Sequence, residues 1–159
     1  MMLVHTRNRA LALAGLWLLL GAAVPAAAEE AKPISQPQEL SKPGLVGEIV
    51  KCQRQDGVLS IQLRIRNTSD KEIRLDVIEG RNFAQYYVTA GAKKYLLLED
   101  SEHVPLTPQA SGSGVLSVKI GKGESWTWWG KYPAPPPEVK SVSFYTPLAA
   151  PFDGVAVSD

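Results

Sequence analysis

The feature that most constrains this fold is an alternation of apolar and polar residues with a period of two. From 59 to 65 every second residue is Leu or Ile, and the residues between them are Ser, Gln and Arg. Successive side chains of a strand point to opposite faces of a sheet, so the pattern predicts a strand with one buried and one solvated face. The same alternation returns over residues 73–77. After residue 30 we find no convincing helical pattern.

Turn signals separate these segments at short intervals. Asp56-Gly57 predicts a tight hairpin between strands at 46–54 and 59–66, and Gly91 lies in a second turn between strands at 83–89 and 94–98. Further strands are expected at 73–77, 115–120, 125–129 and 139–145, with Val155 and Val157 as an apolar pair at the sheet edge. Residues 133–137 contain four prolines and predict an extended connector. About eight short strands at this spacing predict an antiparallel β-sandwich or barrel.

The first segment carries the pattern of a removable signal peptide. Arg7 and Arg9 precede an apolar run over 10–24, and Ala26-Ala27-Ala28 matches a cleavage site. The run is shorter than the roughly 20 residues of a membrane-spanning helix. We therefore expect a cleaved signal at 1–28, a flexible, proline-containing leader at 29–44 and one domain at 45–159. The expected location is periplasmic or extracellular, with no membrane span in the mature chain.

Composition excludes several classes of partner and of covalent stabilisation. Residues 1–28 hold two of the 17 basic residues and none of the 16 acidic ones, so the mature chain has a net charge of −1. This balance gives no electrostatic basis for binding nucleic acid. A single cysteine, Cys52, cannot form an internal disulfide, and its strand parity predicts a buried thiol. The fold is therefore expected to depend on its apolar core, with an intermolecular disulfide or a reactive thiol as the alternatives for Cys52. We expect a monomer.

The order of these motifs is similar to a known type of domain. The segments DGVLSIQLRIRNTSDK, QYYVTAGAKKYLLLEDSE, GKGES, WTWWGKYPAPPPEVKSVSFYTP and PFDGVAV follow one another along the chain. Together they resemble small bacterial extracytoplasmic immunoglobulin-like domains of the DUF4352-like type. The resemblance covers nearly all of residues 45–157, and it implies an immunoglobulin-like sandwich of about seven to nine strands. It implies no catalytic residues.

No catalytic or metal-binding combination of residues is present in the mature chain. His103 is its only histidine and Cys52 its only cysteine, and no Gly-x-Ser-x-Gly motif occurs. Glu99, Asp100 and Glu102 share one acidic loop but lack the spacing of a calcium loop. We therefore expect no catalytic residue, no metal and no cofactor, and a protein that is not an enzyme.

Aromatic residues provide the one suggestion of a binding site. Trp129, Tyr132 and Tyr145 are candidates for an outward-facing platform that stacks on sugars or peptides. The alternative is that Trp126 and Trp128 fill the core while Trp129 and Tyr132 pack under the proline segment.

The function that we expect from these observations is a binding or structural accessory module of the bacterial cell envelope, acting on an envelope protein or glycan. Two specific versions stay open: a carbohydrate- or peptidoglycan-binding domain with an aromatic platform, and a protein-partner module that pairs through a sheet edge.

Overall fold

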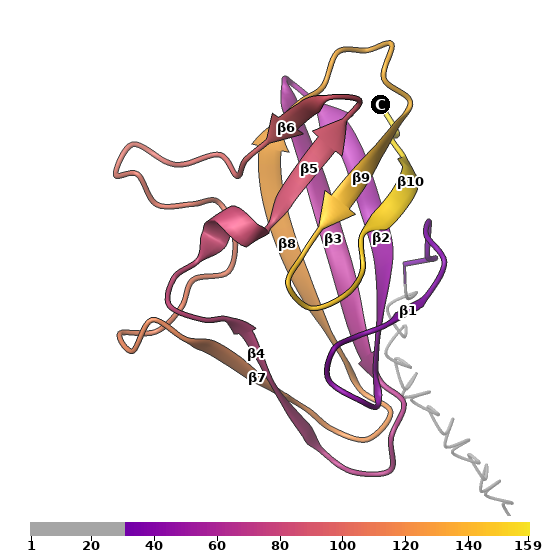
Figure 1. The fold of residues 1–159 in the computed structure, drawn as a ribbon, viewed down its shortest axis with the longest axis vertical. Helices are drawn as coiled ribbons and strands as arrows, with labels where there is room; N and C mark the ends of the chain where they lie inside the picture. The colour runs from indigo at the N-terminus through magenta and orange to yellow at the C-terminus, as the bar shows by residue number, and fades with distance from the viewer. Residues whose placement is uncertain (1–30) are drawn as a thin grey trace, which may run out of the picture. The chain divides into compact units, whose positions relative to one another are not determined.

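The computed structural model describes residues 31–159. The predicted signal peptide lies outside the described residues. Figure 1 shows two sheets packed face to face and a two-stranded ribbon beside them. The first sheet has the order β1 (Gln38–Glu39), β2 (Leu45–Gln55), β3 (Val58–Asn67) and β8 (Ser125–Pro133). The second has the order β10 (Phe152–Ala156), β9 (Ser141–Tyr145), β5 (Tyr87–Ala90) and β6 (Lys93–Tyr95).

Strand pairing within both sheets is antiparallel. The predicted Asp56-Gly57 hairpin is confirmed, because Gln55 pairs with Val58 across it. Asp56 and Gly57 both have a positive φ, which suits the two central residues of a tight hairpin turn. The hairpin around Gly91 is likewise confirmed by the pairing of Ala90 with Lys93. The predicted all-β sandwich is therefore confirmed, whereas its immunoglobulin-like type remains a prediction. Residues 31–159 form ten strands rather than the expected seven to nine.

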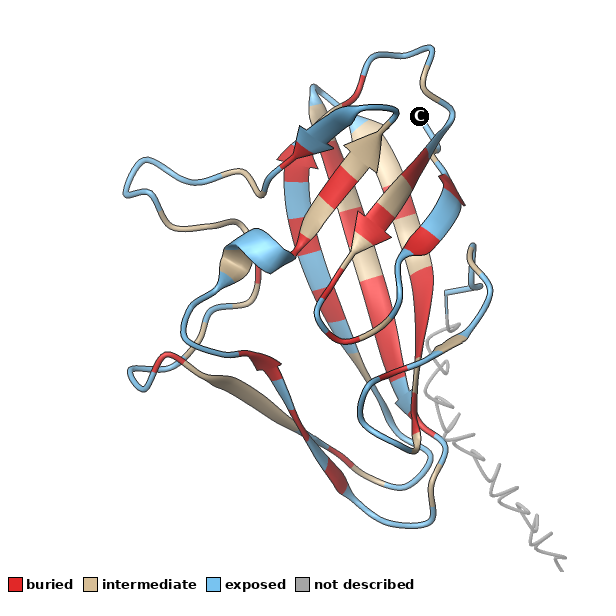
Figure 2. Ribbon diagram, viewed as in Figure 1, coloured by how far each residue is buried: buried red, intermediate tan, exposed pale blue. Residues whose placement is uncertain are grey.

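The core between the two sheets consists of the alternate, inward-facing residues of each strand. Leu59, Ile61, Leu63 and Ile65 of β3 are all completely buried, as their alternation predicted. Trp128 of β8 crosses to the other sheet, where its ring lies 5.4 Å from that of Phe144, measured between centroids. Figure 2 shows this pattern as red bands that repeat along the strands. Burial of these side chains is the main term that stabilises the domain.

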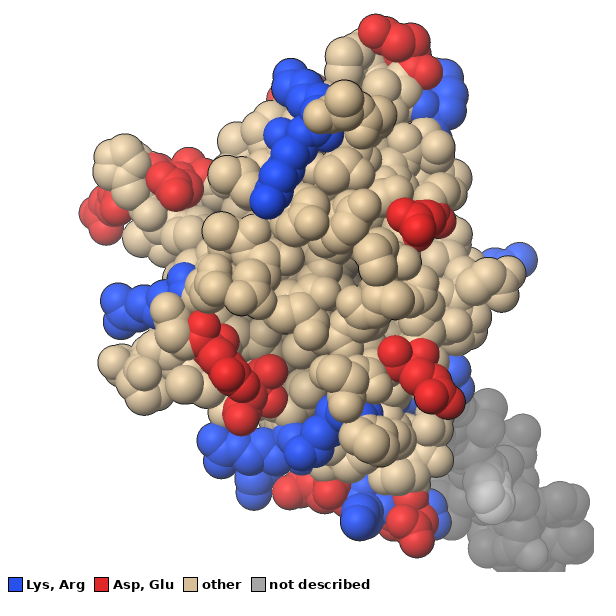
Figure 3. Space-filling view, in the orientation of Figure 1, with Lys and Arg blue, Asp and Glu red and all other residues tan. Residues whose placement is uncertain are grey.

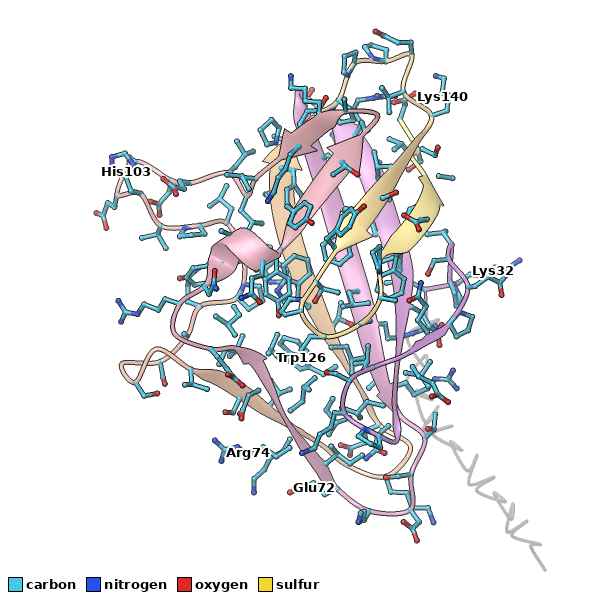
Figure 4. All side chains as sticks on the ribbon, in the orientation of Figure 1. Lys32, Glu72, Arg74, His103, Trp126 and Lys140 are labelled. Atoms are coloured by element: carbon cyan, nitrogen blue, oxygen red, sulfur yellow. The ribbon has the colours of Figure 1, made fainter. Side chains whose placement is uncertain are left out.

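A ribbon of β4 (Ile73–Ile78) and β7 (Leu116–Ile120) stands beside the sandwich (Figure 1). The buried residues of β4 are Ile73, Leu75, Val77 and Ile78. Asn67 fixes the base of the ribbon, because its amide nitrogen donates to the carbonyls of Lys71 and Ile120. Trp126 packs against the core and lies between β4 and the loop after β9 in the view of Figure 4.

The leader expected at 29–44 lies partly against the domain over its described residues. The N–H of Ile34 donates to the carbonyl of Ile49 at 2.8 Å, and β1 pairs with β2. Leu40 is buried, with 6% of its surface exposed. One apolar side chain and main-chain hydrogen bonds to β2 therefore attach a segment whose composition is otherwise polar. Within residues 31–159, no helix has the length and apolar character needed to cross a membrane.

Candidate binding surface

The structure places the three candidate residues, Trp129, Tyr132 and Tyr145, in different environments. Trp129 lies on the outer face of β8, with 39% of its surface exposed. Tyr132 lies three residues further along β8, on the opposite face, and is completely buried. Tyr145 is half-buried on β9, in the other sheet. The three rings therefore do not form one platform.

Tyr132 belongs to the core because β8 extends beyond the expected strand end at residue 129. Its side chain shares the inward parity of Trp128, with Gly130 between them. Burial, together with the neighbouring Tyr86, raises the pKa of the Tyr132 phenol well above its ordinary value. Within the described part of the chain, neither Tyr132 Oη nor Trp128 Nε1 has a hydrogen-bond partner. A phenol in this position is neutral and out of reach of a ligand at the surface.

Tyr145 forms a cross-strand pair with Tyr87 of β5. The two rings are stacked, with 4.5 Å between their centroids and 8° between their planes. On the far side of the Tyr87 ring, Lys94 Nζ lies 3.7 Å from its centroid, a cation–π contact. Lys94, Tyr87 and Tyr145 therefore form a row across three adjacent strands on the outer face of the second sheet. We call this row and its neighbours Thr89 and Ser143 the tyrosine face.

The register of the strands explains the composition of the tyrosine face. Thr89 pairs with Ser143 on one side and with Lys94 on the other, while Tyr87 pairs with Tyr145. Val88 and Phe144, the residues between them, point inward and are completely buried. Figure 3 shows basic side chains over the β5–β6 end of this face and a mostly uncharged surface beside them. The face thus combines aromatic edges, hydroxyl groups and a positive charge.

Stacking determines what the tyrosine face can bind. One side of the Tyr87 ring is covered by Lys94 and the other by Tyr145. Sugar-binding aromatic residues contact the sugar with an open ring face, and Tyr87 has none. The pair instead presents ring edges to the solvent. Amphipathic rings of this kind are characteristic of protein interfaces, where tyrosine is enriched.

The potentially reactive groups lie elsewhere in the molecule. Cys52 is buried, as its parity predicted, and burial raises the pKa of its thiol to about 12. It is therefore a neutral thiol rather than a thiolate near pH 7. His103 stands on an exposed loop (Figure 4), and its Nδ1 lies 3.3 Å from a carboxylate oxygen of Glu99. Within residues 31–159, no three His, Cys, Asp or Glu side chains gather where they could hold a metal ion.

Sequence reasoning did not single out Tyr87 or Lys94. Tyr86 and Tyr87 are adjacent, so only one of them can point outward, and composition alone does not decide which. The hairpin turn at Gly91 contained the missing signal. It sets Thr89 opposite Lys94. Because side chains alternate along a strand, Tyr87, two residues before Thr89, lies on the same face as Thr89.

The comparisons with known proteins provide no relative from which a site could be transferred. No family model matches the chain, and no curated protein or solved structure matches it either. The surface is therefore interpreted from its own geometry.

Proposed function

We propose that this chain is an exported, non-enzymatic binding module of the bacterial envelope that recognises a protein through the tyrosine face. The single observation that carries the proposal is the row of Lys94, Tyr87 and Tyr145 on an otherwise weakly charged sheet surface. In this proposal the domain is of the immunoglobulin-like, DUF4352-like type, and its location is the periplasm or the cell exterior. The alternating strands support this fold type, and the N-terminal signal pattern supports this location.

Two features favour a protein over a glycan as the partner. Both sides of the Tyr87 ring are occupied, which leaves a sugar only the outer side of Tyr145. Trp129, the exposed tryptophan among the described residues, lies on the other sheet and cannot extend the surface. A protein partner can instead accept hydrogen bonds from the tyrosine hydroxyls and place a carboxylate near Lys94.

The test is site-specific photo-crosslinking in cells that produce the protein. A photoreactive phenylalanine analogue replaces Ser143, on the tyrosine face, and in a matched control it replaces Ser60, on the outer face of the first sheet. We expect a protein adduct from position 143 and none from position 60. Excess wild-type protein should suppress the adduct, whereas the Tyr87→Ala/Tyr145→Ala variant should not.

Other results would decide against the proposal. Adducts from both positions, or from position 60 alone, would remove the tyrosine face as the recognition surface. Peptidoglycan fragments that shift the NMR ring signals of Tyr145, in the absence of any protein adduct, would favour the carbohydrate-binding alternative.

A further inference from the structure

A second surface, separate from the tyrosine face, follows from how the strand edges of the molecule are covered. Exposed edges present unpaired N–H and C=O groups, and proteins usually cover or guard them. The loop after β6 covers β8, since Leu98 donates to the carbonyl of Lys131 and Lys131 donates to that of Leu106. Along β2, the N–H of Ile34 donates to the carbonyl of Ile49, and β1 pairs with residues 46 and 47. The N–H of Ser158 donates to the carbonyl of Cys52.

The short edge strands of the sandwich and the ribbon are guarded in other ways. β6 has three residues, two of which are Lys93 and Lys94. β10 is interrupted by a register shift between Phe152 and Val155, and Gly154 has a positive φ of 64° there. β7 carries Lys119. Lysines, bulges and short length are all devices that prevent further strand pairing.

β4 lacks these devices along its first four residues. It has six residues, Ile73–Ile78, without lysine, proline or glycine, and it pairs with β7 alone among the described strands. Its register shift lies between Asp76 and Ile78, so the stretch 73–76 is regular. Its second edge lines a cavity of about 400 Å³, within the range of about 300–1,000 Å³ that is usual for ligand pockets. At one end Tyr86 Oη donates to the carbonyl of Val77. Within residues 31–159, no such cap reaches the stretch from Ile73 to Asp76.

Other segments of this chain line the cavity beside β4. Opposite β4 its wall is formed by Ser41 and Lys42 before β2 and by Pro147 and Leu148 after β9. Leu75 and Leu148 give it an apolar side, and both are buried. One extended chain can enter between these walls. A second copy of this protein would have to bring its own β7 along with β4, so it would need more room than a single extended chain.

The charges on β4 specify what the added strand must carry. Arg74 and Asp76 point to the solvent side, whereas Leu75 between them points inward (Figure 4 labels Arg74). An antiparallel neighbour runs in the opposite direction to β4. From its N-terminal end, its residues therefore lie opposite Asp76, then Leu75, then Arg74. Opposite charges across strands stabilise and like charges destabilise a pair. The complementary order is therefore basic, apolar, acidic.

We infer that the free edge of β4 binds an extended peptide segment of another protein by antiparallel strand addition, with a basic–apolar–acidic triplet opposite Asp76, Leu75 and Arg74. Main-chain hydrogen bonds to β4 would supply affinity, and the alternate side chains would supply selectivity. This inference does not rest on the tyrosine face, which lies on the second sheet rather than on the ribbon.

Two synthetic peptides of identical composition test the inference. The first has the order threonine, lysine, valine, glutamate, valine, threonine, with both ends blocked and a fluorescent label. In the second, lysine and glutamate are exchanged. Fluorescence anisotropy should show that the first peptide binds more tightly by about fivefold or more, because two attractive charge pairs replace two repulsive ones. NMR shifts should concentrate on residues 73–76.

A charge-swapped protein provides the matched control. Arg74→Asp combined with Asp76→Arg keeps the composition of the exposed face and should invert the preference between the two peptides. An unchanged near-ultraviolet circular dichroism spectrum establishes that the variant is folded. Tyr145→Ala should leave peptide binding unaffected, so the outcome is independent of the proposed function.

Several results would overturn the inference. The absence of binding by either peptide would remove the peptide site. Equal affinity for both, or a preference that survives the charge swap, would remove the antiparallel register. Concentration-dependent dimerisation through residues 73–76 would replace the peptide by a second copy of the chain.

Discussion

The sandwich and the β4–β7 ribbon differ in how they cover their apolar faces and the free edges of their strands. In the sandwich, apolar residues from two sheets bury one another, and its outer edges are covered by loops or guarded by lysines and a bulge. In the ribbon, two strands pair with each other, and the second edge of β4 faces a cavity instead of another strand. The same alternating pattern thus produces a closed layer in one region and an open one in the other.

This difference indicates where the molecule can bind without losing stability. Loop and strand edges that already hydrogen-bond within the chain contribute to folding, so a partner that replaced those bonds would compete with the fold. An edge that is free in the folded state can be paired at no such cost. The comparison makes four predictions, which test first the packing of the sandwich and last the polar surface of the ribbon.

The largest effect is expected from removing the central ring of the sandwich. Trp128 is completely buried and stacks with both Tyr86 and Phe144. Trp128→Ala should lower the free energy of unfolding by about 3–5 kcal/mol, the usual cost of deleting a large buried ring. Urea unfolding followed by far-ultraviolet circular dichroism measures it. Trp129→Ala, on the outer face of the same strand, is the control and should change stability by about 0.5 kcal/mol. Equal losses would mean that β8 does not have one inner face.

A smaller loss is expected from adding one methyl group beside that ring. A Cβ atom at Gly130 would lie 2.4 Å from the Trp128 ring and 2.9 Å from a methyl carbon of Leu97. Gly130→Ala should therefore destabilise the protein by about 1–3 kcal/mol through overpacking. Gly112→Ala, where a Cβ atom meets nothing within 4 Å, should leave stability unchanged or slightly raised. A tolerated Gly130→Ala would contradict the close packing described for the sandwich.

The sandwich was more predictable from the sequence than the ribbon, because its signals are local. Asp56-Gly57 fixes a hairpin between neighbouring segments, and alternation then decides which residues of β3 are buried. The pairing of Ile73 with Ile120 joins residues far apart in the chain, and no local signal specifies it. The free edge of β4 follows from that long-range pairing, so it was not predictable either.

The candidate binding residues show the same limit. The outward parity of Tyr145 was read correctly, because β9 is short and regular. For Tyr132 the sequence left two alternatives, a surface platform and packing under the proline segment. The strand was expected to end at Trp129, whereas β8 continues to Pro133 and keeps Tyr132 on the inner face. An error of a few residues in a strand end was enough to exchange surface and core.

The third prediction concerns charge within the sandwich. Burial raises the pKa of Cys52 from 9.0 to about 12, so between these values the thiol ionises in the unfolded chain but not in the folded one. A raised folded-state pKa means that stability is lost as the pH rises. From pH 9 to 12 the free energy of unfolding should fall by up to ~1.4 kcal/mol per pH unit through this group. Cys52→Ala should show a shallower decline than the wild type, measured by urea unfolding at each pH. Parallel declines would mean that Cys52 reaches solvent.

The smallest effect is expected on the polar surface of the ribbon, where it should appear as a pKa change. Asp76 accepts a hydrogen bond from Ser117 and lies 3.6 Å from Arg74, and these contacts lower the pKa of its carboxyl group, the Ser117 bond most of all. Ser117→Ala should raise that pKa toward its ordinary value, as measured by NMR titration of the carboxyl carbon. Lys119→Ala, on the same strand as Ser117, instead removes the partner of Glu72 and should leave the pKa of Asp76 unchanged. If both variants shift it equally, the ribbon surface acts as a diffuse positive field. If Ser117→Ala alone shifts it, Asp76 is held at a defined position, as selective pairing along the free edge of β4 requires.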